Sequence, residues 1–89
     1  MKYEVRFSDS ALKQLKKLDK YTAKLIMSWV HKNLIGCDNP RVHGKGLTSN
    51  KSGYWRYRVG DYRLIAEIQE DEVLILIVNV GHRSVVYDN

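Results

Sequence analysis

The stretch YWRYRVGDYRLI, residues 54–65, predicts a β-hairpin and decides the class of the fold. Large apolar or aromatic residues alternate with arginines over residues 54–59, which is the two-residue period of a strand with two different faces. One face is expected to carry Trp55, Tyr57 and Val59, and the other Tyr54, Arg56 and Arg58. Gly60-Asp61 provides a tight turn, and a second strand is expected over residues 62–69.

The segments around this hairpin complete the predicted order of elements. Residues 2–7 alternate as a half-buried strand, and residues 73–80 are apolar on both faces, as in a central strand. Two helices are expected between the first strand and residues 36–53, which have the composition of a loop. Ser8-Asp9 and Asp19 are the expected helix caps. The apolar stripes of the helices are Ala11, Leu12, Leu15 and Leu18, and then Ala23, Ile26, Met27, Val30 and Leu34.

The order β-α-α-β-β-β indicates an α+β fold in a single domain, residues 1–89. We expect a small, mainly antiparallel four-stranded sheet with the two N-terminal helices packed on one face. The single cysteine, Cys37, excludes an intrachain disulfide and fits a reducing compartment. The longest apolar run, residues 73–78, is too short to span a bilayer. A cytoplasmic protein without a membrane partner is therefore expected.

The charge of the chain is positive and unevenly distributed. The net charge of +5 and the pI near 9.4 favour a polyanionic partner. Lysine is the main cation of the predicted helices, whereas the predicted sheet carries arginines: Arg56, Arg58, Arg63 and Arg83. The planar guanidinium group holds phosphate in a fixed geometry, while lysine acts as a flexible point charge. This distribution predicts a phosphate-binding site on the sheet with a surrounding attractive field.

Arg56 and Arg58 lie two residues apart on a strand, so they project from the same face at a spacing of about 6.5–7 Å. That spacing can match neighbouring phosphates of a single strand of nucleic acid. Arg63 follows the turn and can stand beside them, where a cation would stabilise an anionic transition state. The alternative is that these arginines form ion pairs with Glu67, Glu70 or Asp61.

Gly81-His82-Arg83 follows the predicted central strand, a common position for functional groups. His82 can transfer a proton near neutral pH, and Arg83 can bind phosphate. The alternative for His82 is a structural or merely exposed histidine. Tyr87, close behind, either packs against the core or stacks on a base.

Metal ligands are not expected in this chain. His31, His43 and Cys37 lack the spacing of a metal-binding set. We therefore predict neither a metal nor a cofactor.

The phrase GYWRYRVGDYRLI (53–65), with VGHR (80–83) and VY (86–87), resembles the RelE branch of the RelE/ParE toxin superfamily. The opening is also similar, with Phe7-Ser8, Ala11 and LKKL (15–18), followed by a loop that runs from Asn39-Pro40-Arg41 through Gly44-Lys45 to Leu47. The likeness covers nearly the whole chain in the family's order.

The resemblance implies the toxin of a type II toxin–antitoxin pair. Such a toxin would be a metal-independent endoribonuclease, an mRNA interferase that cuts mRNA in the ribosomal A site. The ribose 2′-oxygen would attack the adjacent phosphate, and the 5′-oxygen would leave. The implied partners are a cognate antitoxin, mRNA, and the ribosome with its RNA.

The resemblance also assigns site residues by position. It implies phosphate binding by Arg63, transition-state stabilisation and leaving-group protonation by Arg83, and base stacking by Tyr87. Arg56 and Arg58 stand where relatives often have lysines.

An arginine is a poor base because it barely deprotonates, which leaves His82 or Tyr87 as the candidate general base. The expected RNA-binding residues are Lys45, Lys51, Arg56 and Arg58.

Two other functions remain open from the sequence. The superfamily includes ParE-like members that poison DNA gyrase without cleaving RNA. A basic RNA-binding module without catalysis is a third reading, suggested by the helix lysines and the lack of a convincing general base.

Overall fold

The computed structural model describes residues 1–47 and 54–85. The elements follow the predicted order, with two additions, the two-residue strand β2 and the 3-10 helix η1. They are β1 (Glu4–Phe7), α1 (Asp9–Lys16), α2 (Lys20–Asn33), β2 (Lys45–Gly46), β3 (Tyr54–Val59), β4 (Tyr62–Gln69), η1 (Glu70–Glu72) and β5 (Leu74–His82).

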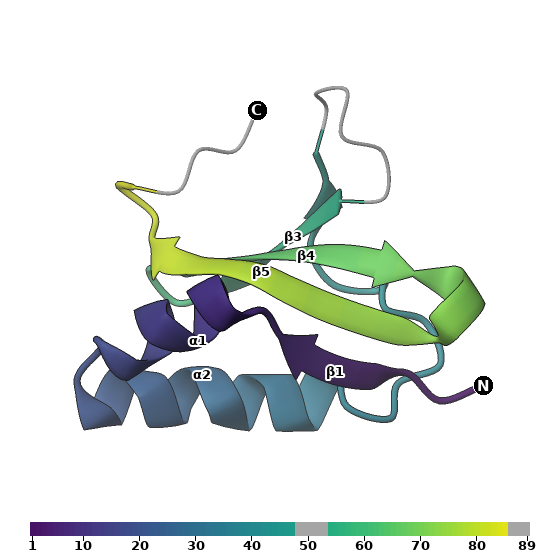
Figure 1. Cartoon of the computed structure of the whole chain (residues 1–89), viewed down its shortest axis with the longest axis horizontal. Helices are drawn as coiled ribbons and strands as arrows, with labels where there is room; N and C mark the ends of the chain where they lie inside the picture. The colour runs from purple at the N-terminus through teal and green to yellow at the C-terminus, as the bar shows by residue number, and fades with distance from the viewer. Residues whose placement is uncertain (48–53, 86–89) are drawn as a thin grey trace.

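The sheet has five strands in the order β1-β5-β4-β3-β2 in the part of the chain that is described (Figure 1). β1 runs parallel to β5, and the other pairings are antiparallel. The prediction of a mainly antiparallel sheet is confirmed, but the expected number of four strands is wrong. β2 lies within the segment predicted as loop, because a two-residue edge strand is too short to show any periodicity.

Both helices lie on the same face of the sheet, as predicted (Figure 1). Ser8 caps α1, where its hydroxyl accepts from the Ala11 amide at 3.1 Å. Asp19 caps α2 by accepting from the Thr22 amide at 3.1 Å and from the Thr22 hydroxyl at 2.6 Å. These hydrogen bonds favour the carboxylate and lower the pKa of Asp19.

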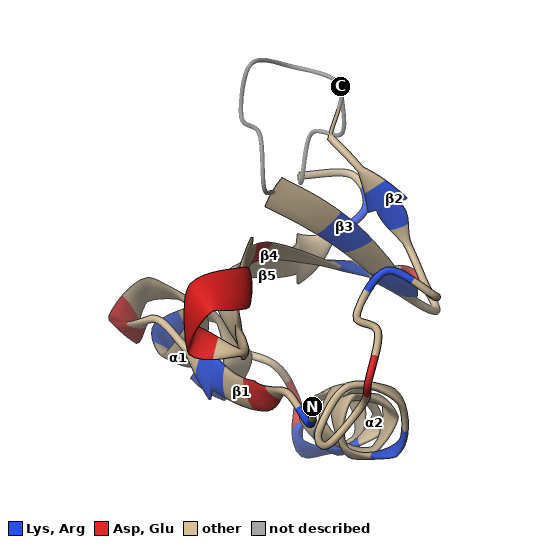
Figure 2. Cartoon of the chain, turned by 90° about the vertical axis from the view of Figure 1, so that its right-hand side faces the viewer, with Lys and Arg blue, Asp and Glu red and all other residues tan. Residues whose placement is uncertain are grey.

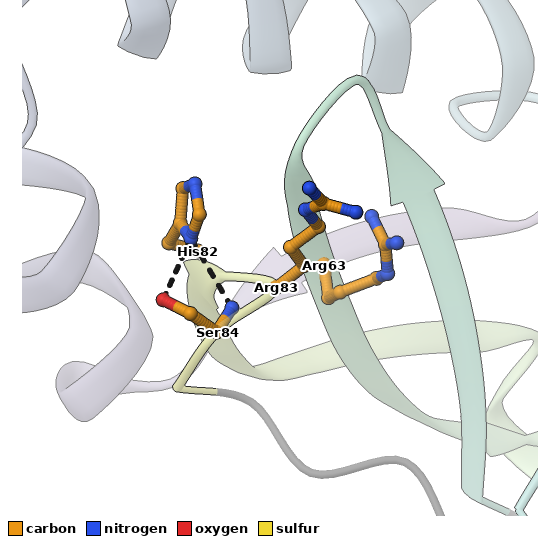
Figure 3. A pocket seen from close by; sticks show the side chains of 4 residues that line it. All are labelled: Arg63, His82, Arg83 and Ser84. Carbon is orange, nitrogen blue, oxygen red and sulfur yellow. Dashed lines mark hydrogen bonds between the residues drawn. The ribbon is translucent and has the colours of Figure 1, made fainter.

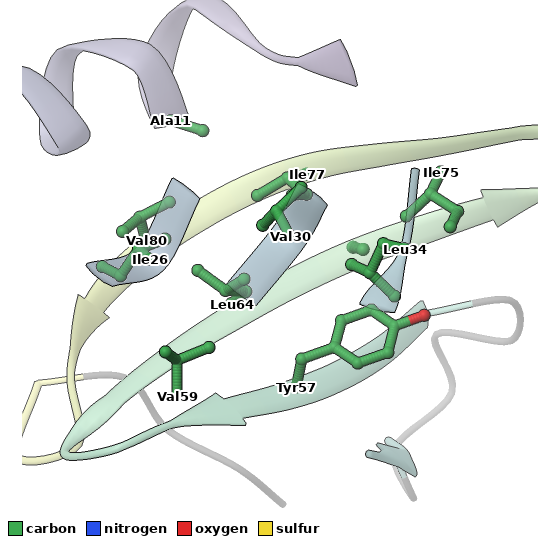
Figure 4. Packing of buried hydrophobic residues seen from close by; sticks show 11 residues of the cluster. Ala11, Ile26, Val30, Leu34, Tyr57, Val59, Leu64, Ile75, Ile77 and Val80 are labelled. Atoms are coloured by element: carbon green, nitrogen blue, oxygen red, sulfur yellow. The ribbon is translucent and has the colours of Figure 1, made fainter. Parts of the chain in front are cut away.

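The core lies between the helices and the inner face of the sheet (Figure 4). Its fully buried large side chains are Tyr57, Ile26, Leu34, Leu64, Ile75, Ile77 and Val30. One predicted stripe residue, Leu12, is 39% exposed, because Ala11 holds the position of α1 that faces the sheet. In a domain of this size nearly every buried apolar side chain is needed for stability.

The segment after α2 returns to the sheet and is tied to β3. The Tyr57 hydroxyl donates to the Pro40 carbonyl at 2.6 Å, and the Trp55 indole donates to the His43 carbonyl at 2.6 Å. Gly44 has a φ of +79°, and a Cβ there would lie 2.2 Å from the Arg56 carbonyl oxygen. Glycine therefore permits the close approach that lets β2 pair with β3.

β5 starts at Leu74, one residue later than predicted, and runs on to His82. Val73 adopts a left-handed φ of +51° at the end of η1, which breaks the strand pattern there. Among the described residues, no helix has the length and apolar character needed to cross a membrane.

Candidate functional site

The three hairpin arginines lie on the sheet face opposite the core. Arg58 on β3 stands directly across from Arg63 on β4, and Arg56 stands across from Ile65. Their neighbours Tyr57 and Val59 are buried against the helices, so alternation sends Arg56 and Arg58 to the outer face. The predicted division of β3 into an apolar and a basic face is confirmed.

Lys45 extends this basic surface onto β2. It pairs with Arg56 across the strands, and cross-strand partners share a face. Figure 2 shows the basic positions on β2 and β3 side by side. We call Lys45, Arg56, Arg58 and Arg63 the basic face.

Backbone carbonyls hold the Arg63 side chain in place. Its guanidinium group donates to the carbonyls of Gly60 and Tyr62, both at 3.1 Å. Desolvation lowers the pKa of Arg63, and the charges of Arg58, Arg56 and Arg83 lower it further, while Asp61 opposes them. The group still remains protonated, because the ordinary arginine pKa lies far above neutrality. The repulsion means that a bound anion would stabilise this arrangement.

The end of β5 brings a second cationic group to Arg63. Gly81 pairs with Arg63, and the Arg83 amide donates to the Asp61 carbonyl at 2.8 Å. Arg63, His82, Arg83 and Ser84 line an open hollow of about 420 Å³. Figure 3 shows the two arginine side chains next to each other, with the His82 ring farther along the wall.

Asp61 holds Arg83 only weakly. The Arg83 Nε lies 3.8 Å from Asp61 Oδ1, and the two side chains are 63% and 71% exposed. Exposed pairs at this distance contribute little to stability. Arg83 is therefore available to an anionic ligand.

Hydrogen bonds with Ser84 orient the His82 ring. Nδ1 accepts from the Ser84 amide at 3.1 Å and lies 2.8 Å from the Ser84 hydroxyl (Figure 3). A backbone N–H can only donate, so Nδ1 carries no proton in this arrangement and the neutral ring has its proton on Nε2. The ring also contacts Tyr62 edge-on, with the centroids 5.5 Å apart. In this geometry Nε2 is a hydrogen-bond donor rather than a base.

Two of the acids considered as partners for the hairpin arginines also have contacts elsewhere. Glu70 forms a 2.8 Å ion pair with Arg41, and Glu67 accepts a hydrogen bond from Gln69 at 3.1 Å. The Arg41 guanidinium also lies 5.6 Å from the Trp55 ring centroid. Sequence reasoning missed this cluster and the role of Ser84, because no local pattern joins residues so far apart or marks a serine that orients a histidine.

Two predicted site residues, Lys51 and Tyr87, lie outside the described residues. Within residues 1–47 and 54–85, His, Cys, Asp and Glu side chains form no group of three or more that could hold a metal.

Comparison with known proteins identifies the family of the chain. The profile of a family described as ParE toxin of type II toxin-antitoxin system, parDE, matches residues 5–87. A RelE-like toxin protein of Escherichia coli is 33% identical over 85 residues, covering 94% of this chain and 86% of that protein. Toxin RelG of Mycobacterium tuberculosis is 30% identical, covering 98% of each chain.

Solved structures show the same fold. A RelBE toxin–antitoxin complex from Mycobacterium tuberculosis superposes with a TM-score of 0.82 at 28% identity, covering 94% of each chain. The isolated RelE toxin of Escherichia coli gives a TM-score of 0.73 at 20% identity, covering 90% of this chain and 83% of that one. The chain therefore belongs to the RelE/ParE superfamily, as a RelE-type toxin of a type II toxin–antitoxin system.

Proposed function

We propose that this toxin is an endoribonuclease that cleaves mRNA in the ribosomal A site without a metal ion. The observation that carries the proposal is the placement of Arg63 on β4 and Arg83 just after β5 around one open hollow at the edge of the basic face. Two neighbouring guanidinium groups can bind a phosphodiester and stabilise the charge that develops during its cleavage.

In the proposed reaction the ribose 2′-hydroxyl attacks the adjacent phosphorus and the 5′-oxygen leaves. The new P–O bond gives a 2′,3′-cyclic phosphate, and the departing strand ends in a 5′-hydroxyl. A base removes the 2′-proton, and an acid supplies a proton to the 5′-oxygen. Arg63 holds the phosphate oxygens, and Arg83 stabilises the charge at the leaving oxygen and serves as its acid.

The remaining roles follow from the family resemblance and, for His82, from hydrogen bonding. Arg56, Arg58, Lys45 and Lys51 bind the RNA backbone on either side of the cut, and Tyr87 stacks on the adjacent base. With its proton on Nε2, His82 donates a hydrogen bond to the phosphate or ribose. Tyr87 is then the better candidate for the base, because His82 could act through Nε2 only by losing the hydrogen bond from the Ser84 amide.

A cognate antitoxin is part of the proposal. Structures of similar fold come from RelB–RelE complexes, among them that of Mycobacterium tuberculosis. A surface of repelling cations such as the basic face attracts acidic peptide segments. Because translating ribosomes are the proposed target, we place the toxin in the cytoplasm.

The test is to map mRNA ends in a purified translation system, with and without ribosomes. We expect the wild-type toxin to cut at A-site codons. A metal chelator, at a concentration below that of the Mg²⁺ that the ribosome needs, should not diminish the cutting. Arg83→Ala should lower the cleavage rate by about 100-fold or more. Arg6→Ala is the matched control, because Arg6 pairs with Leu76, far along β5 from the strand end that precedes Arg83, and its side chain is 70% exposed.

Full cleavage by Arg83→Ala would contradict the assignment of the site. Intact mRNA, together with accumulated cleaved complexes of DNA and gyrase, would replace the proposal with the ParE-like function. Salt-sensitive RNA binding without cuts would indicate a binding module.

A further inference from the structure

β5 extends well beyond its neighbour β1. The last pair between them joins Phe7 to Ile77, whereas β5 continues to His82. On its other side β5 stays paired with β4 as far as Tyr62 and His82. Within residues 1–47 and 54–85, the segment from Val78 to His82 therefore has a strand partner on one edge only, and this segment leads directly to the hollow.

Residues at the start of and within α1 replace β1 along this open edge. The Ser8 amide donates to the Ile77 carbonyl at 2.9 Å, and the Ser8 hydroxyl lies 3.5 Å from the Val78 carbonyl. Further along, the side-chain carbonyl of Gln14 accepts from the Val80 amide at 2.7 Å. Val80 is 2% exposed, so its amide would have no access to water without this acceptor.

Gln14 is held in place by the packing of its own helix. Ala11 is fully buried against the sheet, and Gln14 follows three residues later on the same side of α1. The Ser8 cap fixes the start of the helix. The Gln14 carbonyl thus presents a fixed acceptor to β5 from a rigid element rather than from a loop.

We propose that Gln14 is a positioning residue for the ribonuclease site: its hydrogen bond to the Val80 amide aligns the end of β5, which carries His82 and Arg83. The inference rests on the proposed function. Val80 lies two residues before His82 and three before Arg83, so a small rotation of the strand end would move both side chains relative to Arg63. Because Gln14 does not touch the hollow, it acts on the rate of the chemical step rather than on RNA binding.

Two substitutions distinguish the effect of the hydrogen bond from the effect of the side-chain volume. Gln14→Leu keeps a similar volume but removes the acceptor, and Gln14→Glu restores an acceptor at the same reach. Lys13→Leu is the control for a new leucine on α1, because Lys13 is exposed. Gln14→Met provides a second variant without the acceptor in case Gln14→Leu does not fold.

Amide hydrogen exchange and steady-state cleavage of a ribosome-bound synthetic mRNA would be measured for each variant. For Gln14→Leu we expect exchange at Val80 to be about 10-fold faster. We also expect kcat to fall about 10-fold with little change in KM. Gln14→Glu should restore both values, and Lys13→Leu should match the wild type in both.

A Gln14→Leu variant with wild-type kcat would overturn the inference, as would a Gln14→Glu variant as slow as Gln14→Leu. Equal loss in kcat and in thermal stability for all Gln14 variants would mean a purely structural role and would also overturn it. Failure of the proposed function is distinguishable, because the wild-type toxin would then leave the mRNA intact. In that case the role of Gln14 in positioning residues for cleavage would be wrong together with the proposed function. Faster amide exchange at Val80 in Gln14→Leu would still show that Gln14 orders the strand end.

Discussion

The two faces of the hairpin formed by β3 and β4 have opposite effects on its stability. On the inner face Tyr57 and Leu64 are fully buried in the core. On the outer face Arg58 and Arg63 stand directly opposite each other, although like charges in that position are destabilising. The comparison shows that the inner face supplies the stability of the hairpin, while the outer face gathers like charges whose mutual repulsion an anionic ligand would relieve.

The largest effect is expected from breaking the inner face. Ile77 is fully buried in β5, so Ile77→Ala should lower the free energy of unfolding by about 2–5 kcal/mol. Chemical denaturation followed by circular dichroism measures the loss. Leu76→Ala is the control, because Leu76 is the neighbour on the other face and is only half-buried. An equal loss in both variants would contradict the division of the sheet into two faces.

A substitution of Arg63 on the outer face should lower activity and leave stability nearly unchanged. Arg63→Ala removes a preorganised cation, and we expect mRNA cleavage to fall by about 100- to 1,000-fold. The melting temperature should stay close to that of the wild type, because the variant also removes the repulsion from Arg58. Arg63→Lys should recover only part of the rate, since lysine lacks the planar fork. A large fall in melting temperature would instead mean that Arg63 is mainly structural.

A smaller effect is expected at the contact between Tyr57 on the inner face and the segment that leads to β2. Tyr57→Phe keeps the ring in the core but removes the hydroxyl that donates to the Pro40 carbonyl. The cost should be about 1–3 kcal/mol, because the buried carbonyl loses its partner. Denaturant titration measures this cost. Burial, with a smaller contribution from Cys37, raises the pKa of Tyr57, so the wild-type hydroxyl stays protonated and can donate through the alkaline range in which free tyrosine ionises.

The smallest effect should have the opposite sign. Arg58→Gln removes one of two like charges that face each other, so it should stabilise the free toxin by about 0.2–1 kcal/mol. RNA binding should weaken at the same time, with a shallower dependence on salt. Thermal unfolding and binding at several salt concentrations test both parts. A destabilised variant would show that Arg58 contributes to the fold and not only to the charge of the outer face.

Much of the fold follows from local patterns. Alternation at residues 54–59 correctly divides β3 into its two faces, and Ser8 and Asp19 cap the helices as predicted. These features depend on neighbours within a few residues, where side-chain type and backbone preference act together. β2 and the late start of β5 at Leu74 escaped prediction, because one depends on a long-range pairing and the other on a left-handed turn at Val73.

The candidate site divides in the same way. The residue types and their faces can be read from the chain, including the four arginines and His82. Their proximity to one another cannot be read from the sequence, because Arg63 and Arg83 meet only through the pairing of β4 with β5.

The final arrangement of the site depends on the tertiary structure for a physical reason. A hydrogen bond has no sequence signature when its partners lie far apart, as Gln14 and Val80 do at 66 positions from each other. Periodicity and capping determine which residues form each strand and helix, because they act over a few residues. Strand order and the edge where β1 ends depend on how the whole chain packs.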